Sequence, residues 1–239
     1  MTTTDYPGVI TSFSYLESSL ADFLKEVPYC TKHLRVWSPR LGTILTDAQA
    51  QLDSLWYQQS RQIPSIPPKM SIVSYYRIFA KHLKPQWVVF WSDPPARIVP
   101  FARWKKRIKK IGTTKGDSGA PPWWKASNDL KHNRIVNRQQ ASYKNAVQAL
   151  AALFLGIINC DGCWSMVQQA GWVVPGLSGG PYEKLPPNST GDDRHIAILT
   201  VESKLFTFAC PFGYRARGHK EIYYGRCSPR FRAWNWEKR

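Results

Sequence analysis

The sequence predicts a mainly α-helical fold that carries an irregular Pro-rich insertion and a small β-containing appendage at its C-terminal end. Apolar residues recur at spacings of three and four before residue 84 and again between residues 123 and 158, which is the period of amphipathic helices. Prolines cluster between residues 85 and 122 and interrupt regular structure there. Beyond residue 160 the chain is rich in Gly, Pro and aromatic residues. With 239 residues, of which 43% are hydrophobic, the chain can bury a core.

The first predicted helix covers residues 14–27 and ends before Pro28. The second begins at Pro39, because Ser38 is a good N-cap and proline is favoured at the first helical position, and it extends to about Tyr57. Each helix has an apolar face that a core must cover. The two faces consist of Leu16, Leu20, Phe23, Leu24 and Val27, and of Leu41, Ile44, Leu45, Ala48, Leu52 and Leu55.

A third, shorter helix is predicted from Ser71 to about Leu83, after the proline-containing connector RQIPSIPPK. The insertion over residues 85–122 follows, with strand-like pieces such as WVVFW. The longest helical pattern runs from Trp123 to about Ile158, so we expect one helix there as the spine of the fold. Its expected inward-facing residues are Val136, Tyr143, Val147, Leu150, Leu153, Phe154 and Ile157.

Two runs in the last third of the chain, HIAILTV and KLFTFAC, have the β-branched and aromatic bias of paired strands. We therefore predict two domains. A helical bundle covers residues 1–160 and includes the basic insertion 85–122, and a Gly-, Pro- and aromatic-rich appendage covers residues 161–239.

The chain is strongly basic, with 33 Lys and Arg against 16 Asp and Glu and a net charge of +17. A surplus of this size favours a polyanionic partner, because Lys and Arg displace condensed counterions from phosphates. RNA, DNA and an anionic membrane all fit this charge. A basic protein whose charge serves only solubility fits it as well.

Signals for export or membrane insertion are weak. The amino-terminal residues MTTTDYPGVITSF show no basic segment followed by an apolar one, so no signal peptide is predicted. The longest apolar run, residues 149–158, is about half as long as a bilayer-crossing helix. Five cysteines, an odd number, do not suggest a secreted disulfide framework. We expect a cytoplasmic protein without a membrane partner.

The stretch WWKASNDLKHNR concentrates residue types that carry chemistry. Asn128 and His132 are four residues apart and share one face of a helix. Lys131, Arg134 and Arg138 form a cationic stripe beside them, at spacings of three and four. Such a face can bind a polyanion. In the alternative interpretation the two polar residues hydrogen-bond a neighbouring loop, and the cations are only solvated.

The tryptophan pair, the N-x-x-K-H-x-R motif and the helical pattern that ends in ALAALF resemble the HEPN-type helical proteins of bacteria. The pieces YLESSLADFLKEVPYC, HLRVWSPRL and VPFARW also resemble uncharacterised bacterial relatives of that group, so the likeness covers about residues 15–158. The resemblance implies a four- or five-helix bundle that pairs as a homodimer or with a partner subunit. It also implies a toxin, RNA-processing or phage-defence context.

The active members of such families imply a metal-independent ribonuclease, in which an Arg and a His separated by four to six intervening residues act on the RNA backbone. His132 lacks such an arginine, because residues 125–127 are Lys, Ala and Ser, and lysine lacks the two-point grip of guanidinium. Arg77 and His82 do have the spacing, although His82 can equally just favour the end of a helix. The candidate catalytic residues are His132, Asn128, Arg77 and His82.

The run RWKKRIKKIGTTKG, residues 103–116, is a dense cationic segment. Its cations would neutralise phosphates while Trp104 stacks on an unpaired base, an arrangement typical of single-strand binders. The alternative is a solvated loop anchored by a buried tryptophan. The predicted nucleic-acid-binding residues are Arg103, Trp104, Lys105, Lys106, Arg107, Lys109 and Lys110, together with Lys131, Arg134 and Arg138.

Cys160 and Cys163, in NCDGCW, supply two thiolates on a tight turn, which is half of a tetrahedral zinc site. No second pair stands at the close spacing of structural zinc sites, so we predict no metal and no cofactor, and small buried thiols instead. Zinc would require further ligands from among Cys210, Cys227, His195 and His219.

Three functions fit these observations. The first is a non-catalytic HEPN-like module that binds nucleic acid, RNA before DNA, within a bacterial toxin or defence system. The second is a metal-independent HEPN-type endoribonuclease, and the third is a helical scaffold or interaction protein. We favour the first, because the arginine that the second requires is absent beside His132.

Overall fold

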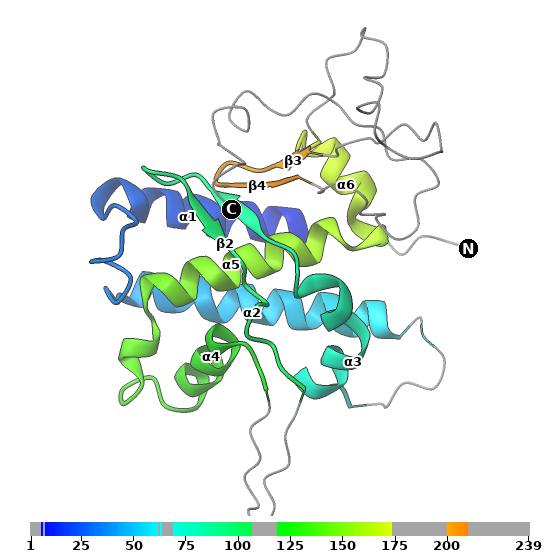
Figure 1. Ribbon diagram of the computed structural model, residues 1–239, viewed down its shortest axis with the longest axis horizontal. Helices are drawn as coiled ribbons and strands as arrows, with labels where there is room; N and C mark the ends of the chain where they lie inside the picture. Colours follow the sequence, from blue (N-terminus) through cyan, green and yellow to red (C-terminus); the bar gives the residue numbers. More distant parts are fainter. Residues whose placement is uncertain are drawn as a thin grey trace, which may run out of the picture.

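The computed structural model describes residues 6, 8–61, 63, 69–106, 119–173 and 200–209 of the chain. Six α-helices and four short strands occur in these residues, so the prediction of a mainly α-helical fold with a small amount of β-structure is confirmed (Figure 1). The helices are α1 Val9–Glu26, α2 Pro39–Ser60, α3 Ile72–Leu83, α4 Pro122–His132, α5 Tyr143–Ile158 and α6 Trp164–Gln169.

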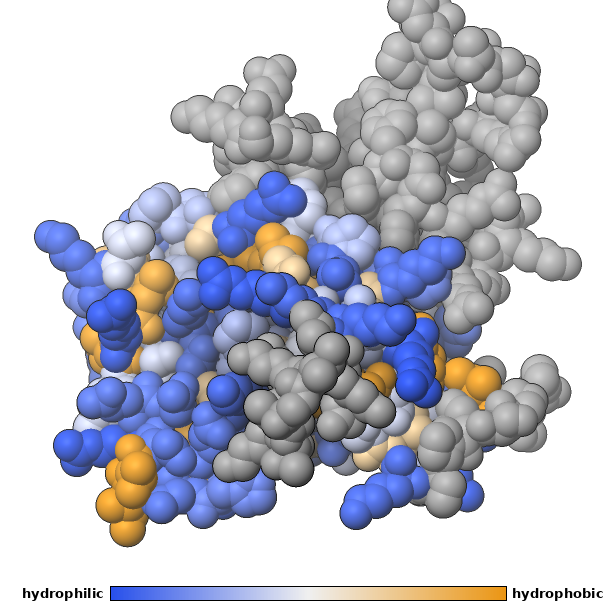
Figure 2. Space-filling view, turned by 60° about the horizontal axis from the view of Figure 1, so that its bottom comes forward, coloured by the Kyte–Doolittle hydropathy of each residue, from blue (hydrophilic) through white to orange (hydrophobic). Residues whose placement is uncertain are grey.

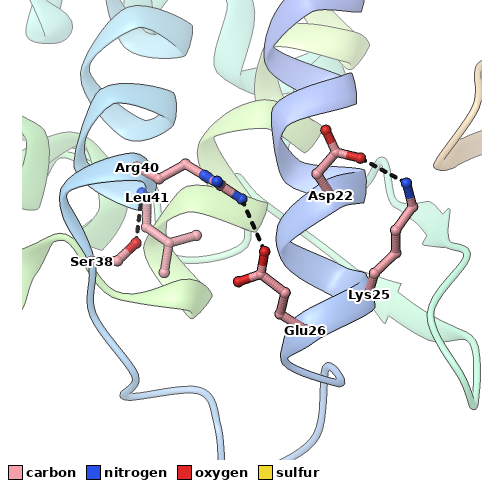
Figure 3. A network of polar contacts seen from close by, with 6 residues as sticks. All are labelled: Asp22, Lys25, Glu26, Ser38, Arg40 and Leu41. Atoms are coloured by element: carbon pink, nitrogen blue, oxygen red, sulfur yellow. Dashed lines mark hydrogen bonds and ion pairs between the residues drawn. The ribbon is translucent and has the colours of Figure 1, made fainter.

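α2 and α3 start where local sequence signals predict, whereas α1 starts at Val9, five residues before the predicted residue 14, and no side-chain cap marks that start. At the start of α2, the Ser38 hydroxyl accepts a hydrogen bond from the backbone N–H of Leu41 at 3.1 Å, as predicted for an N-cap (Figure 3). The hydroxyl of Ser71 caps α3 in the same way and accepts from the Ser74 N–H at 3.4 Å. Both caps involve residues only three apart, so the local sequence is enough to predict them.

Two ion pairs stand at the exposed junction of α1 and α2 (Figure 3). Lys25 Nζ lies 2.8 Å from Asp22 Oδ1 within α1, and Arg40 NH1 lies 3.8 Å from Glu26 Oε1 across the junction. Exposed pairs of this kind contribute about 0–1 kcal/mol each. The packing of α1 on α2 therefore depends on apolar contacts.

The core is built around α2 and α5, which pack against each other at the centre of the molecule (Figure 1). α1 and the strands lie on one side of this pair, and α3 and α4 lie on the other. The two central helices approach closely at Gly156, where an added Cβ would collide with Leu52 Cδ1. The apolar end of α5 is thus buried by protein, as its sequence predicts.

In the described ranges, no single helix has both the length and the apolar character needed to cross a bilayer. α5 and the segment Asp161–Gln169 meet these criteria only when they are taken together, and they are bent by 89° with respect to each other.

The strands β1 Val88–Phe90, β2 Ala96–Ile98, β3 Thr200–Glu202 and β4 Phe206–Ala209 form one antiparallel sheet of order β2-β1-β4-β3. β1 and β2 come from the predicted insertion, whereas β3 and β4 come from the predicted appendage. Their junction is the pairing of Val89 with Thr207 and of Phe90 with Phe206. The domain boundary after residue 160 stays a prediction, but its two sides share this sheet.

An aromatic cluster joins the end of the insertion to the helices. The Trp104 ring stacks on the Trp56 ring of α2, with centroids 5.3 Å apart and planes 7° apart. Trp56 also stacks on Trp124 of α4 at 5.9 Å and on Phe79 of α3 at 5.2 Å. This part of the insertion is therefore core and not a peripheral loop.

The prediction of one helix from Trp123 to Ile158 is wrong. α4 ends at His132, a 3₁₀ turn η1 covers Arg138–Gln140, and α5 starts at Tyr143 after the cap Ser142. The reason is competition by side chains for backbone groups: Asn133 Oδ1 accepts from the Val136 N–H at 3.2 Å, and Asn137 Nδ2 donates to the Asp129 carbonyl at 2.8 Å. Val136, predicted to face inward, is 73% exposed.

Candidate nucleic-acid interface

The C-terminal half of α4 is positioned by Gln49, a buried glutamine of α2. Gln49 Oε1 accepts hydrogen bonds from Ser127 Oγ at 3.0 Å and from Lys131 Nζ at 2.5 Å, and Gln49 Nε2 donates to Asn128 Oδ1 at 3.5 Å. Buried polar groups are stable only when they are paired. Gln49 therefore fixes three polar side chains of α4 against α2.

The two polar candidates of this helix have different surroundings. Asn128 is half-buried and bonded to Gln49, so it has the structural contact that the alternative interpretation expects, although its partner is a helix and not a loop. His132 is the last residue of α4 and is exposed. Of the two residues, only His132 is in the exposed class.

Basic side chains gather where α4 ends, because the following turn folds back onto the helix. The hydrogen bond from Asn137 Nδ2 to the Asp129 carbonyl holds this turn, and η1 packs against α4 directly after it. We call the basic residues Lys131, His132, Arg134 and Arg138 the α4 cationic end. All four are exposed, and they lie at the end of α4 and in the turn after it, not along the single helical stripe that the sequence suggested.

The acidic residue nearest in sequence to the α4 cationic end is Asp129, and it forms no ion pair with the residues that the structure describes there. Among the residues that the structure describes, no carboxylate lies within ion-pairing distance of Lys131, Arg134 or Arg138. On the face seen from the α3 and α4 side, hydrophilic residues predominate among those coloured, and several separate hydrophobic patches lie between them (Figure 2). In the turn itself, Ile135 is 87% exposed. Uncompensated cations attract a polyanion because the association releases its counterions.

Trp37, in the loop between α1 and α2, lies beside this group. The Arg138 Cζ atom is 5.3 Å from the centroid of the Trp37 ring, which is a cation–π distance, and the indole is 42% exposed. The backbone around Trp37 is held by the Ser38 N–H, which donates to the Ala141 carbonyl at 3.4 Å, and by a bridge between Trp37 and Ser142. The interface thus contains an exposed aromatic ring in contact with a cation.

Arg77 and His82 lie on α3, and both are exposed. Five residues of an α-helix turn through about 500°, which leaves the two side chains about 140° apart around the axis, on different faces. α3 contacts α2 through Trp56, about two helical turns beyond Gln49. The structure does not bring this pair to His132, and its catalytic role stays a prediction.

The basic run is only partly described. Arg103, Lys105 and Lys106 are exposed, and the Lys105 N–H donates to the Gly119 carbonyl at 2.8 Å, so these cations lie near the start of α4 and away from its cationic end. The prediction that Trp104 stacks on a base is wrong, because its ring is fully buried. Outside the described residues lie Arg107, Lys109 and Lys110.

Cys160 and Cys163 are buried, reduced thiols at the 3₁₀ turn η2 (Asp161–Cys163), between α5 and α6. A hydrogen bond with the Cys163 thiol, followed by bonds from Gln59 and from backbone N–H groups, lowers the pKa of Cys160 against the opposing effect of burial. In the described part of the chain, no group of three or more His, Cys, Asp or Glu residues could hold a metal. Outside it lie Cys210, Cys227, His195 and His219.

Sequence reasoning missed three residues of this interface: Gln49, Ser127 and Trp37. Gln49 does have a signal, because it stands at helical spacing from Leu45 and Leu52 on the apolar face of α2, where a polar residue needs a partner. Trp37 has no comparable signal, since its loop carries no periodicity and nothing local distinguishes it from a core tryptophan.

The chain was compared with protein-family models, with curated proteins and with solved structures, and none of them matches it.

Proposed function

We propose that the protein is a non-catalytic module that binds nucleic acid, RNA before DNA, through the α4 cationic end. The observation that supports this most directly is the concentration of exposed cations there, none of which forms an ion pair with a carboxylate of the described residues. Lys131 is also held in place by Gln49, so less side-chain freedom is lost when it meets a phosphate. The net charge of +17 adds long-range attraction of the same sign.

We further propose that this module has the HEPN-like bundle implied by the resemblance and acts in a bacterial toxin or defence system, as a homodimer or with a partner subunit. The mainly helical fold is compatible with this. Light scattering measures the oligomeric state. A monomer at all accessible concentrations would remove the homodimer and leave the partner subunit.

The test is the salt dependence of RNA affinity. Binding of a fluorescent single-stranded RNA of about 20 nucleotides is measured by anisotropy between about 50 and 300 mM salt. We expect a steep fall, with a log–log slope that becomes smaller by about 2–3 when three cations are removed. The variant that removes them is Lys131→Gln, Arg134→Ala and Arg138→Ala combined, where glutamine keeps a donor for Gln49.

A matched variant removes the same number of charges elsewhere. The side chains of Lys25, Lys69 and Lys81 are exposed and lie outside the α4 cationic end, so their combined replacement by alanine controls for net charge. It should leave the slope nearly unchanged. Equal loss of affinity in both triple variants would contradict an interface at the end of α4. A flat affinity of the wild type would contradict nucleic-acid binding altogether.

A metal-independent endoribonuclease is the second candidate. The observation that favours it is the exposed imidazole of His132 between Lys131 and Arg134, where it can reach a bound phosphodiester. Labelled RNA is incubated with the protein in EDTA. The endoribonuclease is established if the wild type cleaves the RNA and His132→Ala no longer cleaves it but keeps the salt-dependent binding. Intact RNA that remains bound would support the module.

A further inference from the structure

Trp37 is exposed in a protein that buries aromatic rings readily. Trp37 is 42% exposed, whereas Trp56, Trp104 and Trp123 are fully buried. The backbone of its loop is nonetheless well anchored, because the Tyr143 N–H donates to the Val36 carbonyl at 2.8 Å next to the Trp37–Ser142 bridge. The ring is therefore presented at a fixed place on the surface.

The ring also lies beside the α4 cationic end, where it contacts Arg138. Arg138 Cζ stands 5.3 Å from its centroid, and Arg138 has no carboxylate partner among the described residues. An aromatic face that is held next to a guanidinium group offers stacking to a base and charge to the adjoining phosphate. Along α2, the ten residues from Pro39 to Gln49 correspond to a rise of about 15 Å, so Trp37, just before α2, and Lys131, held by Gln49, can contact one strand.

On the basis of the nucleic-acid binding proposed above, we propose that Trp37 and Arg138 form a stacking platform for one unpaired base. The platform makes the interface selective for single strands. In a duplex the faces of the bases are covered by their neighbours, so the indole cannot reach them, and only the charge contacts remain. Stacking is tolerant of sequence because every base has a π-face, so the selectivity concerns strandedness and not base identity.

The test compares two probes on four proteins. The probes are a labelled oligouridine of about 12 nucleotides and an RNA duplex of about 12 base pairs, measured at one salt concentration. The proteins are the wild type, Trp37→Ala, Trp37→Phe and the control Tyr15→Ala. Tyr15 is the matched control because it is 74% exposed and lies on α1, outside the α4 cationic end.

We expect Trp37→Ala to weaken oligouridine binding by about 10-fold and to change duplex binding by less than about twofold. Trp37→Phe should restore most of the loss, because phenylalanine keeps a stacking face. Tyr15→Ala should change neither probe. A thermal melt of each variant confirms that the comparison is made on folded protein.

The outcomes separate this inference from the proposed function. If Trp37→Ala leaves the binding of both probes unchanged, or weakens both equally, the stacking platform is overturned and nucleic-acid binding stays in place. Absence of binding to either probe by the wild type would overturn both. A loss for oligouridine that Trp37→Phe does not restore would also overturn stacking, because only contacts specific to the indole explain it.

Discussion

Glu17 is a buried carboxylate of α1 whose partners come from the loop between β3 and β4. Ser203 Oγ donates to Glu17 Oε1 at 2.5 Å, and the N–H groups of Leu205 and Lys204 donate to its two oxygens at 2.7 and 3.3 Å. These bonds attach the hairpin to the helical core. Burial nevertheless raises the pKa of Glu17, because it outweighs the hydrogen bonds from Ser203 and the backbone that lower it.

A specific pH dependence of stability follows. Because its pKa is raised by folding, the native state binds the Glu17 proton more tightly than the unfolded state does, and this stabilisation is complete only below the unfolded pKa. As pH rises through the folded pKa it is lost. The free energy of unfolding of the wild type relative to Glu17→Gln should therefore fall with rising pH, by up to about 1.4 kcal/mol per unit between the two pKa values.

Urea unfolding of both proteins at several pH values measures this difference. The exposed Glu26 of the same helix provides the control Glu26→Gln, for which we expect a much smaller change with pH. A wild-type advantage over Glu17→Gln that grows with rising pH would contradict the assignment, since it would mean that the hydrogen bonds outweigh burial.

At the scale of elements, the contact of α2 with α5 depends on a missing side chain. Gly156 lies in α5, inside a fully apolar surrounding, where glycine weakens a helix by about 1 kcal/mol relative to alanine. The position tolerates no Cβ without movement, because Leu52 of α2 fills the space against it and is itself fully buried. At this position the packing of Leu52 against α5 therefore contributes more to stability than the higher helix propensity of alanine would.

We expect Gly156→Ala to lower the free energy of unfolding by about 1–3 kcal/mol, as overpacking does in a dense core. Leu52→Ala alone should cost about 2–5 kcal/mol by leaving a cavity. In the double variant the new methyl group occupies part of that cavity, so its cost should be smaller than the sum of the two single costs. Denaturant unfolding of the four proteins forms the cycle, and strict additivity would show that Gly156 and Leu52 do not meet.

At the scale of the whole molecule, the aromatic cluster of Trp104, Trp56, Phe79 and Trp124 connects the predicted insertion with α2, α3 and α4. The Trp104 ring contacts Trp56 and lies edge-on to Tyr76 at 5.6 Å. Its Nε1 is buried and finds no acceptor among the described residues. The ring therefore contributes through apolar area and stacking, and its N–H opposes this contribution.

Trp104→Ala should lower the free energy of unfolding by about 3–5 kcal/mol, as large deletions in cores do. Trp104→Phe should cost much less, because it keeps an aromatic ring and removes an unpaired buried N–H. Under conditions where each variant is folded, RNA affinity should stay within about twofold of the wild type. A large loss of affinity without loss of stability would show that Trp104 contacts the RNA after all.

The local sequence was enough for elements whose signals lie within a few residues. The caps Ser38 and Ser71 and the apolar period of α1 and α2 predicted helix starts and buried faces, because cap bonds and amphipathic faces are properties of a single element. The same holds for the chemistry of the α4 end, where Lys131 and His132 stand out by type and spacing.

Tertiary structure alone decided which distant segments meet. The pairing of β1 with β4, the bonds of Gln49 to α4 and the position of Trp37 beside Arg138 join residues far apart in the chain, and no local periodicity encodes such partners. Tertiary packing also decided which tryptophans are buried: Trp104 fills the core, whereas Trp37 remains at the surface. By itself the sequence determined where α2 and α3 start, which faces are apolar and how much positive charge is present. Packing decided which cations and rings share one surface.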